Sequence, residues 1–238
     1  MTLSWQVELA EIQPNVHATI LDVLRRQVDK VPLVVRLVFV LGSLTSSEEE
    51  HRIKIFEVEG ALDLLLSLLV THVDELLRAM AEAKGGGGRG DGKGEGAAAF
   101  VMNHPSQDLL VKLVRLLAHL AISSEVGPEM GKSPHVEAML RLLENVSIQE
   151  TEELLLNTVS LVTNLTYYAS SSSVLWDRRM QLLPLLAEML FVENHEAVLE
   201  AARAFGNLSR CPQARKKMQD TRVDEALVML LDHSDSQV

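Results

Sequence analysis

The chain has 238 residues, of which 47% are hydrophobic and only 4% aromatic, and its formal net charge at pH 7 is -11. This acidic balance argues against nucleic acid as a partner, because binding phosphate groups requires a basic surface. The single cysteine, Cys211, excludes a disulfide within the chain. No uncharged apolar run approaches the ~18 residues that cross a membrane, and the first residues lack the pattern of a signal peptide. We therefore expect a soluble, cytoplasmic protein.

The first predicted elements are helices joined by short polar stretches. An incomplete helical unit occupies residues 1–30. The segment Val38–Thr45 (VFVLGSLT) then ends a helical pattern, and the polar stretch Glu48–Val58 can hold a short helix. Apolar residues at helical spacing from Leu62 onward predict another helix. Together these elements form a first unit near residues 31–69.

A glycine-rich segment, 83–99, interrupts the helical pattern. Such sequence buries too little apolar surface to offset its conformational entropy, so it predicts a flexible loop inserted between two units. Its part Gly87–Gly94 (GGRGDGKG) nearly matches the phosphate-binding pattern GxxxxGK[ST], but Gly94 stands where a hydroxyl is required and no strand precedes it. We expect no nucleotide or other small-molecule substrate and no cofactor.

Three further units follow with a period of ~42 residues. They lie near 105–143, 149–190 and 194–231. Each contains a segment that aligns with Val38–Thr45: Val114–Ile122 (VRLLAHLAI), Val159–Tyr167 (VSLVTNLTY) and Ala202–Arg210 (ARAFGNLSR).

One column of this alignment holds Ser43, His119, Asn164 and Asn207. A leucine follows the column in every copy, a small residue precedes it, and an apolar residue stands nine positions before it. These spacings predict one buried stripe on an α-helix, with a small-residue column that lets the neighbouring helix approach closely. Proline or an acid eleven positions before the column predicts that the four helices begin in register.

Three helices per unit of this length is the armadillo arrangement. With its ARAFGNLSR and VSLVTNLTY segments, the chain resembles the armadillo-repeat family over about residues 31–238. The resemblance implies an all-α, right-handed superhelical solenoid of about four three-helix repeats, with one Gly-rich loop insertion. We expect this solenoid to form a single domain, 1–238. The last unit leaves an apolar end uncapped, so we expect a fragment of a longer protein.

The resemblance also implies a site. In the family the third helix of each repeat lines a concave groove, where an asparagine column hydrogen-bonds the backbone of an extended partner peptide. That role transfers to Asn164 and Asn207, whereas Ser43 and His119 depart from it. Importin-type members carry tryptophan four residues before the asparagine. This chain has Phe39, Arg115, Ser160 and Arg203 at those positions, which argues against capture of basic nuclear-import signals.

Positions four and seven residues before the column share its helix face. The seven-before positions are Arg36, Lys112, Asn157 and Glu200. Four cations against one anion predict a basic concave stripe that recruits an acidic or phosphorylated segment of a partner protein. An ordinary solvated helix surface is the alternative interpretation. The candidate groove residues are Asn164, Asn207, Arg36, Lys112, Arg115, Arg203, Phe39 and His119.

No pattern predicts catalysis. The eight histidines are scattered without a partner at metal-ligand spacing, and no serine stands in a GxSxG motif. We expect a non-enzymatic interaction scaffold or adaptor that binds protein and neither membrane nor nucleic acid. The stretch Leu155–Tyr168 resembles a ciliary member of the family, which implies cilium organisation or assembly of axonemal complexes such as radial spokes, in the cytoplasm or cilium. Alternatives are an importin-type nuclear transport adaptor and the substrate-binding repeats of a ubiquitin ligase.

Overall fold

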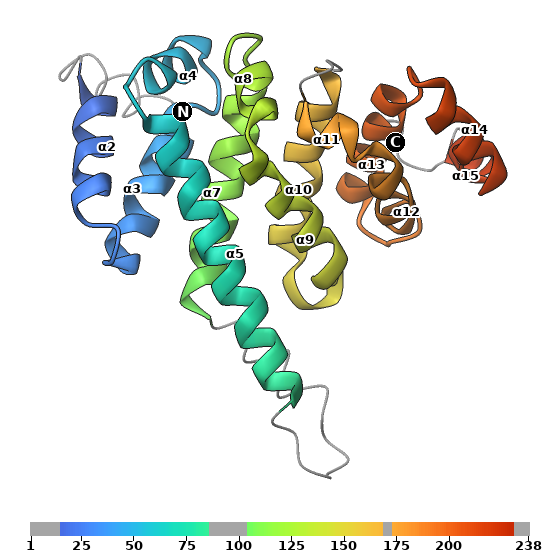
Figure 1. Cartoon of the computed structure of the whole chain (residues 1–238), viewed down its shortest axis with the longest axis horizontal. Helices are drawn as coiled ribbons and strands as arrows, with labels where there is room; N and C mark the ends of the chain where they lie inside the picture. Colours follow the sequence, from blue (N-terminus) through green and yellow to red (C-terminus); the bar gives the residue numbers. More distant parts are fainter. Residues whose placement is uncertain (1–14, 86–103, 169–172, 231–238) are drawn as a thin grey trace.

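A computed structural model describes residues 15–85, 104–168 and 173–230, which form helices joined by short loops and contain no strand. The helices succeed one another along the long axis of the molecule in chain order (Figure 1). Each unit packs on its neighbours in sequence, which is the arrangement of a solenoid. The all-α armadillo-type solenoid predicted from the sequence is confirmed.

Four helices that carry the alignment column form a continuous row. They are α3 (Val31–Leu44), α7 (Pro105–Ala121), α10 (Ile148–Tyr167) and α13 (His195–Leu208). Each packs extensively on the next one along the chain. We call them the third helices, after their place in an armadillo repeat.

The remaining helices complete the repeats. One set consists of α2 (Val16–Arg26), α5 (Ala61–Gly85), α9 (Ala138–Asn145), α12 (Arg179–Met189) and α15 (Val223–Met229). The short helices are α4 (Glu49–Phe56), α8 (Val126–Lys132), the 3-10 helix η1 (Pro134–Glu137), α11 (Val174–Asp177) and α14 (Pro212–Asp220). The short helix predicted within Glu48–Val58 is thus confirmed as α4. No described helix has the length and hydropathy that crossing a bilayer would require.

Local signals set where the third helices begin. Proline occupies the first turn of α3 and of α7, where its missing N–H costs nothing. Asn194 caps α13, its side chain accepting a hydrogen bond from the backbone N–H of Ala197 at 3.0 Å. The backbone of α10 is non-helical at Thr151, so its regular part follows that residue, close to the predicted start at Glu153.

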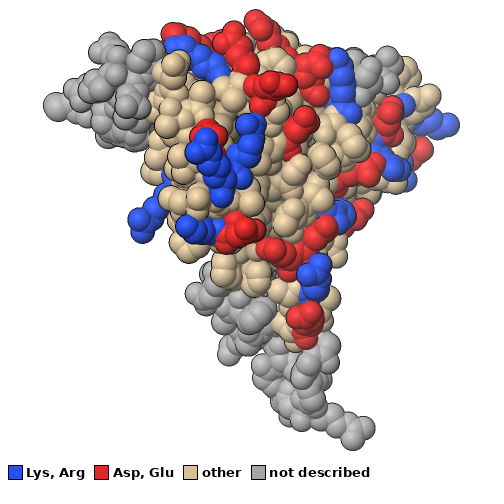
Figure 2. All heavy atoms as spheres, turned by 60° about the vertical axis from the view of Figure 1, so that its left-hand side comes forward, with Lys and Arg blue, Asp and Glu red and all other residues tan. Residues whose placement is uncertain are grey.

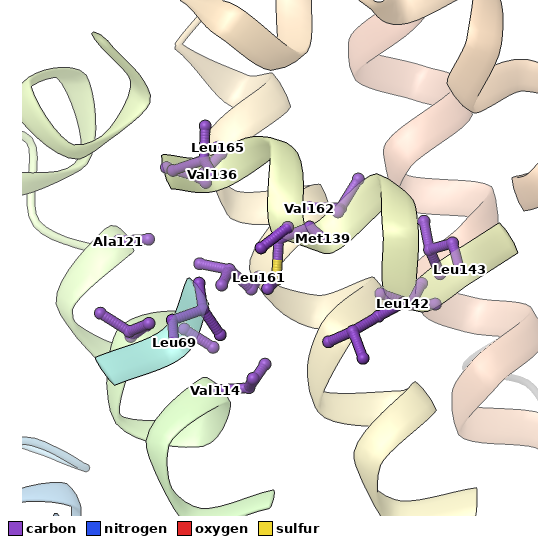
Figure 3. Close-up of a cluster of buried hydrophobic side chains, with 14 of the residues drawn as sticks. Leu69, Val114, Ala121, Val136, Met139, Leu142, Leu143, Leu161, Val162 and Leu165 are labelled. Atoms are coloured by element: carbon purple, nitrogen blue, oxygen red, sulfur yellow. The ribbon is translucent and has the colours of Figure 1, made fainter. Parts of the chain in front are cut away.

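The core consists of aliphatic side chains between the stacked helices. The leucine that follows the column is buried in all four copies, and so is the apolar residue nine positions before the column. Figure 3 shows side chains of α5, α7, η1, α9 and α10 meeting in one such layer. Burying a side chain of this size stabilises the fold by about 1.5–3 kcal/mol, so packing of the repeated stripe holds the units together.

Helix α5 is longer than predicted. It continues beyond Leu69, the expected end of the first unit, to Gly85, and it projects from the row of helices (Figure 1). The reason is that Val73, Leu76 and Met80 continue the buried stripe at helical spacing and α5 goes on packing against α7. The predicted loop at 83–99 therefore starts too early, since residues 83–85 are helical; the rest of it, 86–99, lies outside the described residues.

Candidate peptide-binding groove

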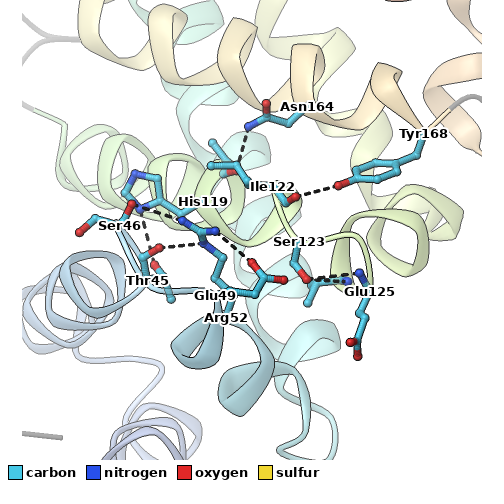
Figure 4. Close-up of polar contacts among 12 residues, drawn as sticks. Thr45, Ser46, Glu49, Arg52, His119, Ile122, Ser123, Glu125, Asn164 and Tyr168 are labelled. Atoms are coloured by element: carbon cyan, nitrogen blue, oxygen red, sulfur yellow. Dashed lines mark hydrogen bonds and ion pairs between the residues drawn. The ribbon is translucent and has the colours of Figure 1, made fainter.

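The alignment column connects each third helix to the one before it. In three copies the column side chain makes a hydrogen bond to the carbonyl oxygen that directly precedes the column in the preceding repeat. The pairs are His119 Nδ1 with Gly42, Asn164 Nδ2 with Ala118, and Asn207 Nδ2 with Thr163, all at 3.0 Å. Figure 4 shows the side chains of His119 and Asn164 in this role. The column thus fixes the register of consecutive repeats.

This contact leaves part of each asparagine side chain available. The Nδ2 atoms of Asn164 and Asn207 donate within the protein, while their Oδ1 atoms accept no hydrogen bond from any described residue. An amide oxygen on the surface of a groove can accept a backbone N–H of a bound peptide. The two asparagines can therefore hold the repeats together and contact a ligand at the same time.

His119 takes the same structural position as the asparagines. The Gly42 carbonyl can only accept, so Nδ1 of His119 donates and carries the hydrogen, which leaves Nε2 as an acceptor in the neutral ring. Burial lowers the pKa of His119, the bond to Gly42 opposes this, and the charge of Arg115 lowers the pKa further. The ring is consequently neutral at pH 7.

A first hollow, of about 300 Å³, opens between α3 and α7. We call it the basic hollow; its lining residues are Phe39, Gly42, Ser43, Ser46, Lys112, Arg115 and His119. Phe39 is 53% exposed there, and Arg115 is exposed and makes no ion pair with any described residue. Four of the predicted groove residues are thus brought together: Phe39, Lys112, Arg115 and His119.

A second hollow, of about 380 Å³, opens between α10 and α13 beside the end of α7. We call it the apolar hollow; its lining residues are Ala121, Ile122, Thr163, Asn164, Tyr167, Tyr168, Arg203 and Asn207. Ile122 is 49% exposed and Tyr167 62% exposed. This hollow brings together the predicted residues Asn164, Arg203 and Asn207. The remaining predicted residue, Arg36, is exposed on α3 and lines neither hollow.

Acidic neighbours reduce the charge of the predicted basic stripe. Lys112 Nζ lies 3.6 Å from a carboxylate oxygen of Glu153, and Arg203 forms a 2.8 Å ion pair with Glu200. Of the four predicted cations, Arg36 and Arg115 form no ion pair with a described residue, and of these two only Arg115 lines a hollow. On the face seen in Figure 2, basic side chains likewise lie in small groups among acidic ones.

The sequence reasoning missed a second column, three positions after the first. This column holds Ser46, Ile122, Tyr167 and Arg210. The first three line the hollows, and the guanidinium of Arg210 lies over the Tyr167 ring, 5.6 Å from its centroid. Positions three apart share a helix face, and the aligned segments already end at Ile122, Tyr167 and Arg210, so comparing the position three after the first column would have found them.

Comparisons with known proteins agree with this architecture. The chain is 34% identical over 217 residues to armadillo repeat-containing protein 2 of Bos taurus, and 33% identical over 218 residues to the Homo sapiens protein of that name. Each alignment covers 91% of this chain but only 24% of the relative. The chain thus spans about a quarter of the length of the curated relatives it matches. No family model matches it.

Solved structures show the same fold. An engineered protein superposes with a TM-score of 0.57 at 19% identity, covering 93% of both chains. A designed armadillo repeat protein gives a TM-score of 0.53 at 16% identity, covering 87% of this chain and 89% of the design. A second design, in complex with the peptide (KR)4, gives 0.51 at 16% identity and covers 92% and 93%. With its repeated third helices and its inter-repeat column, the chain has the armadillo-repeat fold of these solved structures and is similar in sequence to armadillo repeat-containing protein 2.

Proposed function

We propose that the chain is a non-enzymatic interaction scaffold whose third helices bind an extended segment of a partner protein. The two hollows support this proposal, because both lie along the row formed by α3, α7, α10 and α13. Stacked repeats expose an extended binding surface of this kind. One of the designed proteins that share the fold is in complex with a peptide, which supports a peptide as the class of ligand.

We propose further that the bound segment is acidic or phosphorylated. The observation that carries this is Arg115, which is exposed in the basic hollow and has no acidic partner among the described residues. Lys112 adds a second cation whose contact with Glu153, at 3.6 Å, is long for an ion pair. A carboxylate or phosphate in this hollow would form charge-assisted hydrogen bonds, which are about twice as strong as neutral ones.

Charge reversal at Arg115 tests this proposal. The Arg115→Glu variant should bind the partner at least about fivefold more weakly at low salt, the equivalent of ~1 kcal/mol, and should show a flatter dependence of affinity on salt. Arg203→Glu should have a smaller effect because Glu200 already compensates Arg203. The matched control is Arg26→Glu, which changes the net charge equally on α2, away from both hollows. Unchanged affinity of Arg115→Glu at low salt would disprove an anionic ligand.

We propose a ciliary setting for this scaffold, in cilium organisation or in the assembly of axonemal complexes such as radial spokes. The resemblance of Leu155–Tyr168 to a ciliary armadillo protein supports it. Affinity purification of the full-length protein from ciliated cells tests the setting. Axonemal or intraflagellar partners would support it, whereas importin-β would indicate nuclear transport and ubiquitin-conjugating enzymes would indicate a ligase.

A further inference from the structure

The two hollows of the groove differ in chemistry. In the basic hollow, Arg115 extends toward solvent without an acidic partner, Lys112 stands on the same helix, and Ser43 lines the same space. The Ser46 hydroxyl already donates to the Ser43 carbonyl oxygen at 2.8 Å. Phe39 adds an exposed ring beside these polar groups. This combination favours an anionic side chain, because an anion gains both the charge of Arg115 and donated hydrogen bonds.

In the apolar hollow, Arg203 and the hydroxyls of Thr163 and Tyr168 are already engaged within the protein. Arg203 is paired with Glu200, whose side chain is only 13% exposed, and the Tyr168 hydroxyl donates to the Ile122 carbonyl at 2.8 Å (Figure 4). Arg210 donates to the carbonyl oxygens of Thr166 and Tyr167.

What the apolar hollow still offers is apolar surface, two amide oxygens and the Tyr167 hydroxyl. Ile122 and Tyr167 present exposed apolar surface, and Asn164 and Asn207 present Oδ1 atoms that no described residue hydrogen-bonds. An uncharged apolar side chain fits this environment, with the peptide backbone donating to the asparagines.

The spacing of the third helices relates the two hollows to each other. The basic hollow lies between α3 and α7, and the apolar hollow lies two third helices further along, between α10 and α13. Packed helices are about 8–10 Å apart, so two steps correspond to about 16–20 Å. An extended chain advances about 3.3 Å per residue, and it covers this distance in about five or six residues.

We propose that the groove recognises a two-point motif in one extended peptide: an acidic side chain in the basic hollow and an apolar side chain in the apolar hollow, about five or six residues apart and in one fixed order. This inference rests on the proposed function, since it requires the groove to bind an extended segment. It adds the identity of each contact and the distance between them.

Selection from a library of random 16-residue peptides displayed against the purified chain tests the motif. Enriched peptides should share an Asp or Glu and a large apolar residue at that spacing. In a synthetic copy of one such peptide, inserting two residues between the two positions should weaken binding at least tenfold. Replacing the acid by phosphoserine should preserve or strengthen binding.

Double-mutant cycles assign each contact to its hollow. The Arg115→Ala variant should bind the selected peptide more weakly than the parent protein does. Changing the acid of the peptide to its amide, Glu→Gln, should then weaken binding to this variant no further. The Tyr167→Ala variant should also bind the selected peptide more weakly, and replacing the apolar residue of the peptide by Ala should weaken binding to this variant no further. The crossed pairs should be additive, because independent sites do not couple. Arg26→Ala is the matched control and should leave both affinities unchanged. Each cycle compares how much the peptide change weakens binding to the parent protein and to the variant. The coupling can therefore still be measured if one variant is less stable.

The outcomes separate the motif from the proposed function. If no peptide is enriched over an unrelated helical protein, the proposed peptide-binding function fails and the motif fails with it. If peptides bind the groove but show no fixed spacing, or if Arg115 couples to the apolar position, the motif is wrong while the proposed function stands.

Discussion

The Nδ1 atom of His119 lies 3.0 Å from the carbonyl oxygen of Gly42, in the third helix of the preceding repeat. The same atom lies 3.5 Å from the Thr45 hydroxyl. Two repeats further along the chain, Asn207 reproduces both contacts, with the carbonyl of Thr163 and the hydroxyl of Thr166. A histidine and an asparagine therefore perform one structural task, because Nδ1 of histidine and Nδ2 of asparagine are both bonded to Cγ.

This equivalence predicts the effect of substitutions at residue 119. His119→Asn should leave the free energy of unfolding nearly unchanged, since asparagine can donate to Gly42 from the same place. His119→Leu should destabilise the protein by about 1 kcal/mol, because the hydrogen bond is lost and no donor replaces it. Urea unfolding followed by circular dichroism measures both values. Equal losses in the two variants would show that the hydrogen bond is not what residue 119 contributes.

Gly127 in α8 predicts a second pair of outcomes. A Cβ at this position would lie 2.2 Å from a ring carbon of Tyr168 and 2.7 Å from the carbonyl oxygen of Ala121, so Gly127→Ala should destabilise by about 1–3 kcal/mol through overpacking. The control is Gly206→Ala in α13, where a Cβ would meet no atom within 4 Å. That variant should be neutral or slightly stabilising, because alanine favours helix more than glycine does. In thermal unfolding, the melting temperature of Gly127→Ala should be lower than that of the parent protein, and that of Gly206→Ala should be equal to it or higher.

Arg52 is a buried arginine that joins the end of α3 to α4. Its guanidinium donates to the carbonyl oxygens of Thr45 and Ser46 and pairs with Glu49 at 3.0 Å (Figure 4). Arg52→Leu should therefore cost about 2–4 kcal/mol of stability, since it leaves these acceptors without a donor.

The matched control for Arg52 is Arg26→Leu. Arg26 forms an ion pair with Asp22 in which the two side chains are 73% and 47% exposed. Such an exposed pair contributes less than about 1 kcal/mol. Denaturant unfolding of both variants distinguishes the two sites, and a loss at residue 26 as large as that at residue 52 would contradict the interpretation.

His17 predicts a loss of stability in mild acid. Its ring stacks near that of His51 with centroids 5.0 Å apart, and both of its nitrogens are buried without a hydrogen-bond partner among the described residues. Burial, reinforced by the charges of His51 and Lys54, lowers the pKa of His17 from 6.5 to about 4. Because the folded protein holds its proton less readily than the unfolded chain, stability is full above pH 6.5 and falls as the pH drops toward 4.

The free energy of unfolding at pH 7 and pH 5 measures this effect. The parent protein should lose on the order of 2 kcal/mol between these values through His17. His17→Leu should lose correspondingly less, and part of the remaining slope belongs to His51, whose pKa burial also lowers. If the variant and the parent lose the same stability, His17 is not the group that titrates.

The repeat architecture could be predicted from the sequence because its signals are local. The leucine after the column and the apolar residue nine positions before it follow from helical periodicity, and both are buried in every copy. Helix starts were likewise signalled by residues such as Pro32 and Glu196. The end of α5 was not predicted, since the glycine-rich composition that begins near residue 83 outweighed the apolar spacing of Leu76 and Met80.

The charge and shape of the groove depended on tertiary structure. The contact between Lys112 and Glu153 joins residues on different helices, whereas the pairing of Arg203 with Glu200 is a local contact between residues three apart on α13. The inter-repeat hydrogen bonds of Asn164 and Asn207 also cross from one helix to the next. The sequence by itself determined which face of each helix is buried, because helical periodicity requires only local spacing. Only the stacking of the repeats decided which polar atoms find a partner and which remain for a ligand, because that depends on distances between helices far apart in the chain.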